Sequence, residues 1–368
     1  MSLSSAFYSA LSGLDSHSTA MQVIGDNIAN LQTTGYKSSS AHFEDVLGES
    51  LSTVSGTDRI GVGAKVSSVD VNFTQASVMT TNVDTDLAIN GQGFFVLNDA
   101  SSDELYYTRA GHFYMDVEGY YVNAQGKRVQ GYLFDSSGTN LIETLADIRI
   151  DPASVVAPTV TGEVDMVLNL DPSETAIPAG FDIANPGTTS HYSTALPIYD
   201  TLGQSHTIQV YFTKTAAQTW EWNATIDGSD VQGGTPGTLE LFGTGTIAFN
   251  TSGALTTAMP VDFYTEAITF ANGIAASAID LDLTGSTQYG SPSGIQTLLQ
   301  DGYASGVLSG VTINSDGTMV GHYTNGQVKN LARLALADFT NLDGLERCGS
   351  MLFKSSPRSG PPCLLYTS

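Results

Sequence analysis

Positive charge is scarce in this chain of 368 residues, which has 13 Lys and Arg against 37 Asp and Glu and a formal net charge of −24. Proteins that bind nucleic acids or anionic lipid need a basic face, so the charge balance argues against both classes. Charged residues of either sign make up 14% of the chain, against about 25% in ordinary globular domains. The predicted surface is therefore built largely from uncharged polar side chains.

Cysteines and long apolar runs are also scarce. Cys348 and Cys363 are the only cysteines, which argues against a disulfide scaffold and a cysteine-based zinc site. No apolar stretch approaches the roughly 18 residues that a membrane-spanning helix needs. No Lys or Arg precedes Lys37, so the positive region of a secretory signal peptide is missing. The sequence predicts a soluble protein that is exported, if at all, by another route.

Signs of catalysis and of ligand binding are few. Residues 91–93, Gly-Gln-Gly, lack the third glycine and the following helix of a dinucleotide site. Asp84 and Asp86 lack the glycine and the glutamate that complete a calcium loop. The six histidines show no metal-ligand spacing, and we place His206 and His322 on the surface of alternating strands. We therefore predict no enzymatic activity, no cofactor and no metal site.

The first 31 residues show a clear heptad pattern. Apolar residues recur in alternating steps of four and three, with His17 as one polar member, and predict a helix over 3–31. Gly13 and Gly25 each cost this helix about 1 kcal/mol relative to Ala, so it is marginal alone and needs a partner. An ordinary helix packed on its own domain is the alternative. The predicted subunit-assembly seam consists of Leu3, Phe7, Ala10, Leu14, Met21, Ile24, Ile28 and Leu31.

The rest of the chain is typical of β structure. Residues 32–70 are rich in Ser, Thr and Gly and look extended, and from Val71 onward the apolar pattern has a period of two. Alternating apolar residues predict strands over 207–213 and 220–226. Asn325-Gly326 predicts a hairpin turn.

Several motifs occur in the order found in one protein family. Residues 26–37 resemble N-N-x-A-N-x-x-T-x-G-[FY]-K, the signature of flagellar rod and hook proteins, although Asp26 replaces its first Asn. Short polar side chains and a glycine of this kind suit the end of a helix. Residues 87–95 resemble a motif that ends in G-x-G-F-F, and 107–113 resemble Y-T-R-x-G-x-F. The matching residues include Asn27, Ala29, Asn30, Thr33, Gly35, Tyr36, Lys37, Gly91, Gly93, Phe94 and Phe95.

The middle of the chain separates the two branches of this family. Residues 198–206 and 211–214 resemble the outer domain of hook proteins, an insertion that distal rod proteins typically lack. The chain therefore resembles hook proteins most. A distal rod subunit is the alternative, and a secreted β-rich adhesin, favoured only by Trp220 and Trp222, is a more distant one.

The resemblance implies a mainly β fold with an N-terminal α-helix, in which a discontinuous inner β-domain carries an inserted outer β-domain. The expected parts are a helix and extended linker over 1–70, a middle domain over 71–147 plus 295–355, and an outer domain over 148–294. Stretches bearing Pro and Gly, near 151–162 and 286–294, mark the expected boundaries.

The end of the chain departs from the family, whose members normally finish with a second long heptad helix. The resemblance runs to about Pro361, and residues 362–368 resemble nothing in the family. We predict an aberrant or truncated tail over 356–368, with Cys348 as an alternative starting point. A divergent natural terminus is the other interpretation.

The resemblance also implies a function. Hook subunits polymerise into a flexible curved tube that transmits torque from rod to filament. They are exported unfolded by a type III apparatus without a cleaved signal peptide. The implied location is the extracellular hook and basal body of the flagellum. The implied partners are further copies of the chain, the hook cap, the distal rod, the hook–filament junction proteins and the export apparatus, with neither nucleic acid nor membrane.

Overall fold

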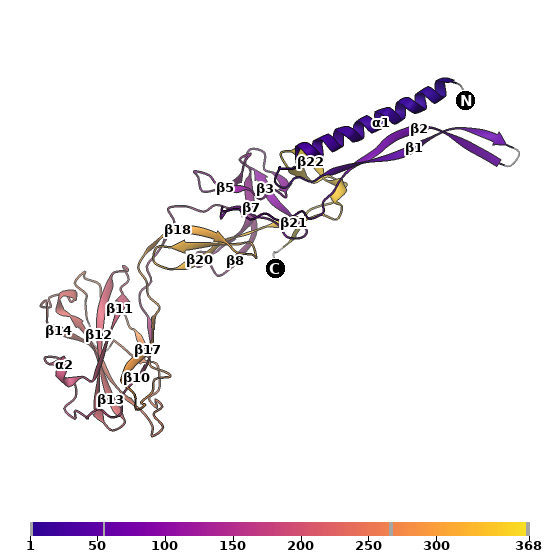
Figure 1. Cartoon of the computed structure of the whole chain (residues 1–368). Helices are drawn as coiled ribbons and strands as arrows, with labels where there is room; N and C mark the ends of the chain where they lie inside the picture. The colour runs from indigo at the N-terminus through magenta and orange to yellow at the C-terminus, as the bar shows by residue number, and fades with distance from the viewer. Residues whose placement is uncertain (1–2, 54–55, 265–267, 366–368) are drawn as a thin grey trace. The chain divides into compact units, whose positions relative to one another are not determined.

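The computed structural model describes residues 3–53, 56–264 and 268–365, and side chains over 6–47, 61–264 and 268–365. The protein is mainly β with one long N-terminal helix, as predicted (Figure 1). The chain divides into two compact units, described separately below. Unit 1 comprises Met1–Ser154, Ser309–His322 and Val328–Ser368, and unit 2 comprises Val155–Leu308 and Tyr323–Gln327.

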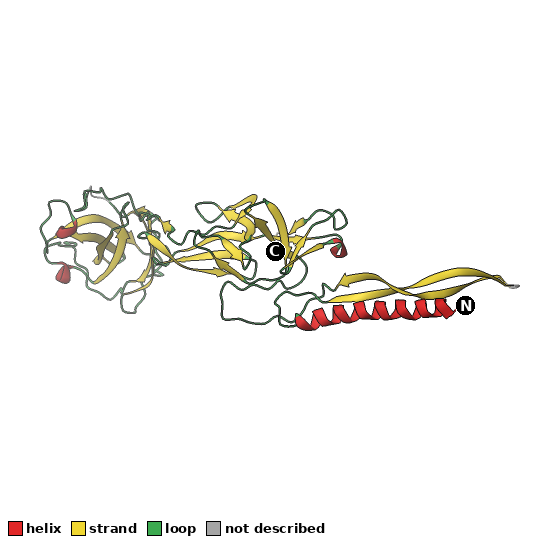
Figure 2. Ribbon diagram, turned by 90° about the horizontal axis from the view of Figure 1, so that it is seen from above, coloured by secondary structure: helices red, strands yellow, loops and turns green. Residues whose placement is uncertain are grey.

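The N-terminal part of unit 1 consists of a helix and a two-stranded hairpin, which we call the arm. Helix α1 (Leu3–Ala29) ends two residues before the predicted limit. Strands β1 (Ser39–Thr53) and β2 (Gly56–Val71) pair in antiparallel fashion. They run beside α1 in both ribbon views (Figures 1 and 2). The segment predicted to be extended therefore forms a hairpin that covers one face of the helix.

The remainder of unit 1, which we call the body, is a β structure with a small aromatic core. Phe94, Tyr107 and Phe353 are buried in this core, with edge-to-face ring contacts such as the 4.7 Å between Tyr107 and Phe339. Its elements are β3 (Phe94–Asp99), β4 (Glu104–Thr108), β5 (Phe113–Met115), β6 (Tyr121–Asn123), β7 (Arg128–Phe134), β8 (Leu141–Asp147), β19 (Thr318–Tyr323), β20 (Val328–Leu334), β21 (Leu336–Asp338), η2 (Leu342–Gly344), β22 (Glu346–Gly349), β23 (Leu352–Lys354) and β24 (Cys363–Leu365). Strand β18 (Gly306–Ile313) begins in unit 2 and ends in unit 1.

Strand β24 lies within the segment predicted to be an aberrant tail. It pairs with β21, which also pairs with β3 at the centre of the body. Residues 363–365 therefore belong to the sheet of unit 1.

Unit 2 contains two four-stranded sheets around one core. The first sheet has the antiparallel order β11-β12-β13-β14, and the second has the order β15-β16-β10-β17, in which only the β10–β16 pairing is parallel. The elements are β9 (Val155–Val156), β10 (Glu163–Asn169), α2 (Pro186–Thr189), β11 (Tyr192–Tyr199), β12 (Ser205–Ala216), β13 (Thr219–Asp227), η1 (Gly228–Asp230), β14 (Leu239–Ala248), β15 (Val261–Asp262), β16 (Asp280–Asp282) and β17 (Gly294–Gln300).

The alternating pattern of β13 places its aromatic residues in this core. Trp220, Trp222, Ala224 and Ile226 are all buried, as the period of two predicts. A Cβ atom on Gly245 of the neighbouring strand would lie 2.7 Å from the ring of Trp222. Glycine at this position therefore makes room for the indole.

Two expectations from the sequence differ from the structure. His206, placed on the surface, is only 1% exposed, because it shares the core face of β12 with Ile208 and stacks on Phe270 at 3.7 Å. His322 is exposed, as expected. Strand β17, placed in the middle domain, pairs with β10 in unit 2, and the contact boundary falls after Leu308. The functional domain boundaries remain a proposal.

Candidate assembly surface

Helix α1 packs on the hairpin through a face of small polar residues. The Ser16 hydroxyl donates a hydrogen bond to the Ala64 carbonyl at 3.1 Å, and the Ala64 amide donates to Ser12 Oγ at 3.3 Å. A Cβ atom at Gly63 would lie 2.0 Å from the same Oγ. The missing side chain at Gly63 therefore permits a close approach between helix and strand.

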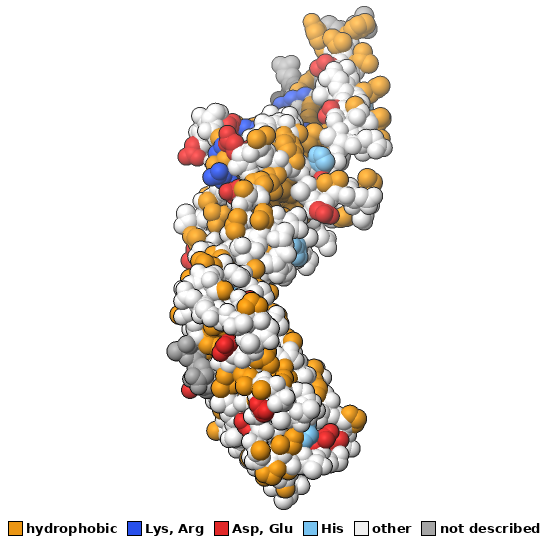
Figure 3. All heavy atoms as spheres, turned by 90° about the vertical axis from the view of Figure 1, so that its left-hand side faces the viewer, with side chains coloured by type: hydrophobic (Ala, Val, Ile, Leu, Met, Phe, Trp, Pro, Cys, Tyr) orange, Lys and Arg blue, Asp and Glu red, His pale blue; other side chains and the backbone are white. Residues whose placement is uncertain are grey.

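The opposite face of α1 carries the predicted seam, and its described side chains are exposed. Met21 is 73% exposed and Ile24, the least exposed large residue of the seam, is 55% exposed. Ala10 is also exposed, whereas the side chain of Leu3 lies outside the described residues. The other large exposed members are Phe7, Leu14, Ile28 and Leu31. Hydrophobic side chains appear on this end of unit 1 in the space-filling view (Figure 3).

Burying each large apolar side chain is worth roughly 1.5–3 kcal/mol, so an exposed row of this kind is a candidate contact surface. His17 adjoins the seam and lies against the Phe43 ring of β1, with centroids 5.6 Å apart. Helix α1 therefore packs on the hairpin on one side and exposes large apolar side chains on the other.

The motif at 26–37 forms the junction between α1 and β1. The side chain of Asn27 acts like a strand partner for Ser39: its amide donates to the Ser39 carbonyl at 2.7 Å, and its oxygen accepts from the Ser39 amide at 2.9 Å. The Tyr36 hydroxyl donates to the Asp26 carboxylate at 2.9 Å, and burial together with Asp26 raises the pKa of Tyr36. Lys37 donates through Nζ to the Thr74 carbonyl at 2.8 Å.

The other residues of this motif shape the turn. Asn30 donates to the Asp26 carbonyl at 3.0 Å and Thr33 Oγ1 donates to Asn30 Oδ1 at 3.1 Å, so both close the end of the helix. Gly35 has a φ of +76°, and a Cβ there would lie 2.6 Å from the Ala110 amide nitrogen. Ala29 is exposed at the helix end.

The second and third motifs meet in the body rather than on α1. Gly91 and Gly93 have φ values of +117° and +108°, which other residues rarely adopt. Phe94 and Phe95 follow them into the core. Arg109, from the third motif, donates through Nη1 to the Gly91 carbonyl at 2.7 Å and lies over the Phe94 ring. These residues stabilise the body and do not extend the seam.

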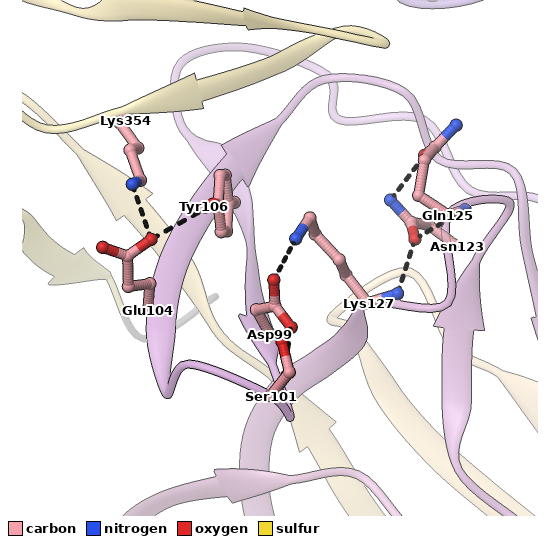
Figure 4. Close-up of polar contacts among 8 residues, drawn as sticks. All are labelled: Asp99, Ser101, Glu104, Tyr106, Asn123, Gln125, Lys127 and Lys354. Carbon is pink, nitrogen blue, oxygen red and sulfur yellow. Dashed lines mark hydrogen bonds and ion pairs between the residues drawn. The ribbon is translucent and has the colours of Figure 1, made fainter.

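Ion pairs on the body were not foreseen from the sequence (Figure 4). The Asp99–Lys127 distance is 2.7 Å and the Glu104–Lys354 distance is 2.6 Å, with both lysines near the ring of Tyr106. The hydrogen bond from Lys127 is the main cause that holds the pKa of Asp99 below its usual value. Both pairs are partly exposed and link neighbouring strands, and ion pairs in contact with solvent contribute little to stability.

No three His, Cys, Asp or Glu side chains in the described part of the chain are placed to hold a metal ion. Asp86, once considered for a calcium loop, instead accepts hydrogen bonds from Thr81 and from His112, the latter at 2.6 Å if that nitrogen carries the proton. None of the helices within the described ranges is both long and apolar enough to span a bilayer.

Family profiles match three successive stretches of the chain. The profile for the flagella basal body rod protein matches residues 7–37, which include most of α1 and the junction motif. The profile for the D1 domain of flagellar hook protein FlgE/F/G matches 88–165. The profile for the D2 domain of flagellar basal body protein FlaE matches 169–303. Together with the exposed helix and β-rich units, these matches define a structural protein of the bacterial flagellum.

Similarity to individual proteins narrows this class. The flagellar hook protein FlgE of Treponema pallidum is 31% identical, with 96% of this chain and 86% of the relative covered. The same protein of Escherichia coli K12 is 33% identical, with coverages of 96% and 84%. The solved structure of Helicobacter pylori flagellar hook protein FlgE2 matches with a TM-score of 0.55 at 16% identity, covers 78% of this chain and 96% of its own, and so shows a common fold. This chain belongs to the flagellar hook protein family.

Proposed function

We propose that this chain, a structural subunit of the bacterial flagellar hook, polymerises with copies of itself through the apolar seam of α1. The observation that carries the proposal is the division of α1 into two faces. Its polar face is occupied by the hairpin, whereas its large apolar residues remain exposed. Burial of this seam between neighbouring copies supplies the driving force for assembly.

The composition of unit 2 supports a flexible tube rather than a rigid one. Lys214 is the only Lys or Arg in unit 2, and it is buried, with its Nζ hydrogen-bonded to the carbonyls of Pro172 and Glu174. Copies of unit 2 consequently lack exposed Lys and Arg side chains with which to form ion pairs with one another. Polar contacts without such pairs differ little in energy between neighbouring positions, which suits a tube that bends while it transmits torque.

A distal rod subunit is a weaker candidate. The match over 169–303 supports the hook because it covers most of unit 2, the part that resembles the outer domain of hook proteins. The hook cap, the distal rod, the junction proteins and the export apparatus belong to the proposal as partners of a hook subunit.

The test is a charge placed on the seam. Met21→Asp puts a carboxylate where neighbouring copies bury apolar surface, whereas Gln22→Asp puts the same charge on the next residue, which is exposed and polar and is not one of the seam residues. In cells without their own hook gene, we expect Met21→Asp to reduce hook formation and swimming at least about tenfold, because a buried unpaired charge is costly. Gln22→Asp should retain most of both.

Hooks are counted by electron microscopy, and circular dichroism of the purified variants checks that both fold. Equal assembly by the two variants would contradict the seam as the contact between subunits.

A further inference from the structure

The junction between the arm and the body contains a side chain that lies outside the recognised motifs. Arg347, in β22 of the body, lies beside the start of β1. Its Nη1 donates to Ser39 Oγ at 2.9 Å, and its Nη2 donates to the Lys37 carbonyl at 2.8 Å. One guanidinium thus holds two groups at the base of the arm, although 310 positions separate Arg347 from Lys37.

Both residues that Arg347 contacts make further hydrogen bonds at the junction. The backbone of Ser39 is paired with Asn27 at the end of α1, and the Lys37 ammonium is bonded to the Thr74 carbonyl. The Tyr36 ring lies 5.9 Å from the Arg347 guanidinium. A side chain that binds at this point is therefore linked both to the end of α1 and to the start of the hairpin.

We infer that Arg347 is a positioning residue that fixes the orientation of the arm on the body, and through it the direction in which the α1 seam faces. Two parallel N–H donors on a planar group restrict orientation more than a single donor does. A lysine would keep the charge but could not reproduce this fork. The consequence for assembly rests on the proposed function, whereas the orientation of the arm does not.

The alternative hypothesis is that Arg347 stabilises the core of the body, and this hypothesis predicts a different experimental result. Arg347 is exposed, so its loss should leave the core of the body intact. The loss should instead loosen the backbone around 37–41, where the arm begins. Hydrogen exchange can separate a local effect from a global one.

The experiment measures amide hydrogen exchange by mass spectrometry in the full-length monomer. In Arg347→Gln we expect exchange across 37–41 to be about fivefold faster than in the unchanged chain, while exchange across Phe94–Leu97 in β3 stays the same. Arg347→Lys should show most of this acceleration. Arg358→Gln, at another exposed arginine whose backbone rather than side chain makes the described hydrogen bonds, serves as the matched control and should leave both segments unchanged.

Three results would overturn the inference. Unchanged exchange at 37–41 in Arg347→Gln would show that the fork does not hold the arm. Equal acceleration at 37–41 and 94–97 would show a general loss of stability instead. Full protection in Arg347→Lys would show that charge alone is sufficient. Because the measurement uses the monomer, its outcome is independent of the assembly test on Met21.

Discussion

The arm and unit 2 differ in the exposure of their large apolar side chains. In unit 2, two sheets enclose the apolar residues, and Trp222 and Phe212 are almost fully buried. In the arm, the hairpin covers the polar face of α1, and large residues such as Met21 remain exposed. Unit 2 thus has a core of its own, whereas the large apolar side chains of the arm remain exposed and free to contact other molecules. Unit 2 is therefore stabilised by its own core, whereas the proposed assembly role belongs to the exposed face of the arm.

The largest expected effect is a truncation in the core of unit 2. Trp222→Ala removes a fully buried indole and leaves a cavity, so the free energy of unfolding of unit 2 should fall by about 3–5 kcal/mol. Urea denaturation followed by the fluorescence of Trp220, also in unit 2, measures the change. Met21→Ala on the exposed seam is the control and should alter unfolding by less than about 0.5 kcal/mol. A similar loss in both variants would refute the contrast between the two regions.

The next effect concerns a buried carboxylate in unit 2. Asp200 is 3% exposed and accepts hydrogen bonds from Asn272 and from the backbone amides of Leu202 and Gln204. Burial opposes its ionisation, but these bonds, with one involving His206, outweigh burial and hold its pKa below 3.8. Asp200→Asn should therefore cost unit 2 about 1–3 kcal/mol at pH 7.

The pH dependence of this effect has a definite sign. A carboxylate whose folded-state pKa is lowered stabilises the protein above its unfolded pKa, near 3.8, and loses this contribution as the pH falls through the lower folded value. The difference between Asp200→Asn and the unchanged chain should consequently shrink as the pH falls below about 4. Denaturation at several pH values tests this, with Asp165→Asn, at an exposed position of β10, as the control. A constant difference would contradict the assignment to the Asp200 charge.

A smaller effect is expected where α1 meets the hairpin. Gly63→Ala places a methyl group against Ser12 at a backbone φ of +134°, so α1 should be displaced from β2 at a cost of about 1–2 kcal/mol. Hydrogen exchange in α1 should accelerate while exchange in unit 2 does not change. Gly61→Ala, at a position where no heavy atom of the described residues lies within 4 Å of the added Cβ, is the matched control. Protection of α1 as strong as in the control would show that the helix does not depend on this close approach.

The smallest expected effect lies at the junction motif. Asp26 places a negative charge in the last turn of α1, which is unfavourable beside the C-terminal end of the helix dipole, yet it accepts hydrogen bonds from Tyr36 and Asn30. Asp26→Asn removes the charge but weakens these bonds, so the stability of the arm should change by less than about 0.5 kcal/mol. Thermal unfolding followed by circular dichroism measures it. A loss above about 1 kcal/mol would show that the carboxylate is essential to the junction.

Local patterns in the sequence were sufficient to predict several parts of the fold. The period of two in β13 buries Trp220 and Trp222, and the heptad period places Leu14 and Met21 on one exposed face of α1. Both predictions succeed because the period of a strand or helix depends only on neighbouring residues. The same rule applies to His206, whose predicted surface position was wrong: its spacing of two from Ile208 places it on the buried face of β12.

Only the tertiary structure decided which faces and segments meet. The sequence shows that α1 has a polar face, but the hairpin that covers this face is set by the packing of Ser12 and Ser16 on β2. The pairing of β24 with β21 and the contact from Arg347 to Lys37 likewise join residues far apart in the chain. Such contacts leave no periodic pattern in the sequence, because they depend on the packing of the whole unit. The sequence by itself determined which helix face is apolar, and the fold determined that this face is the one left open.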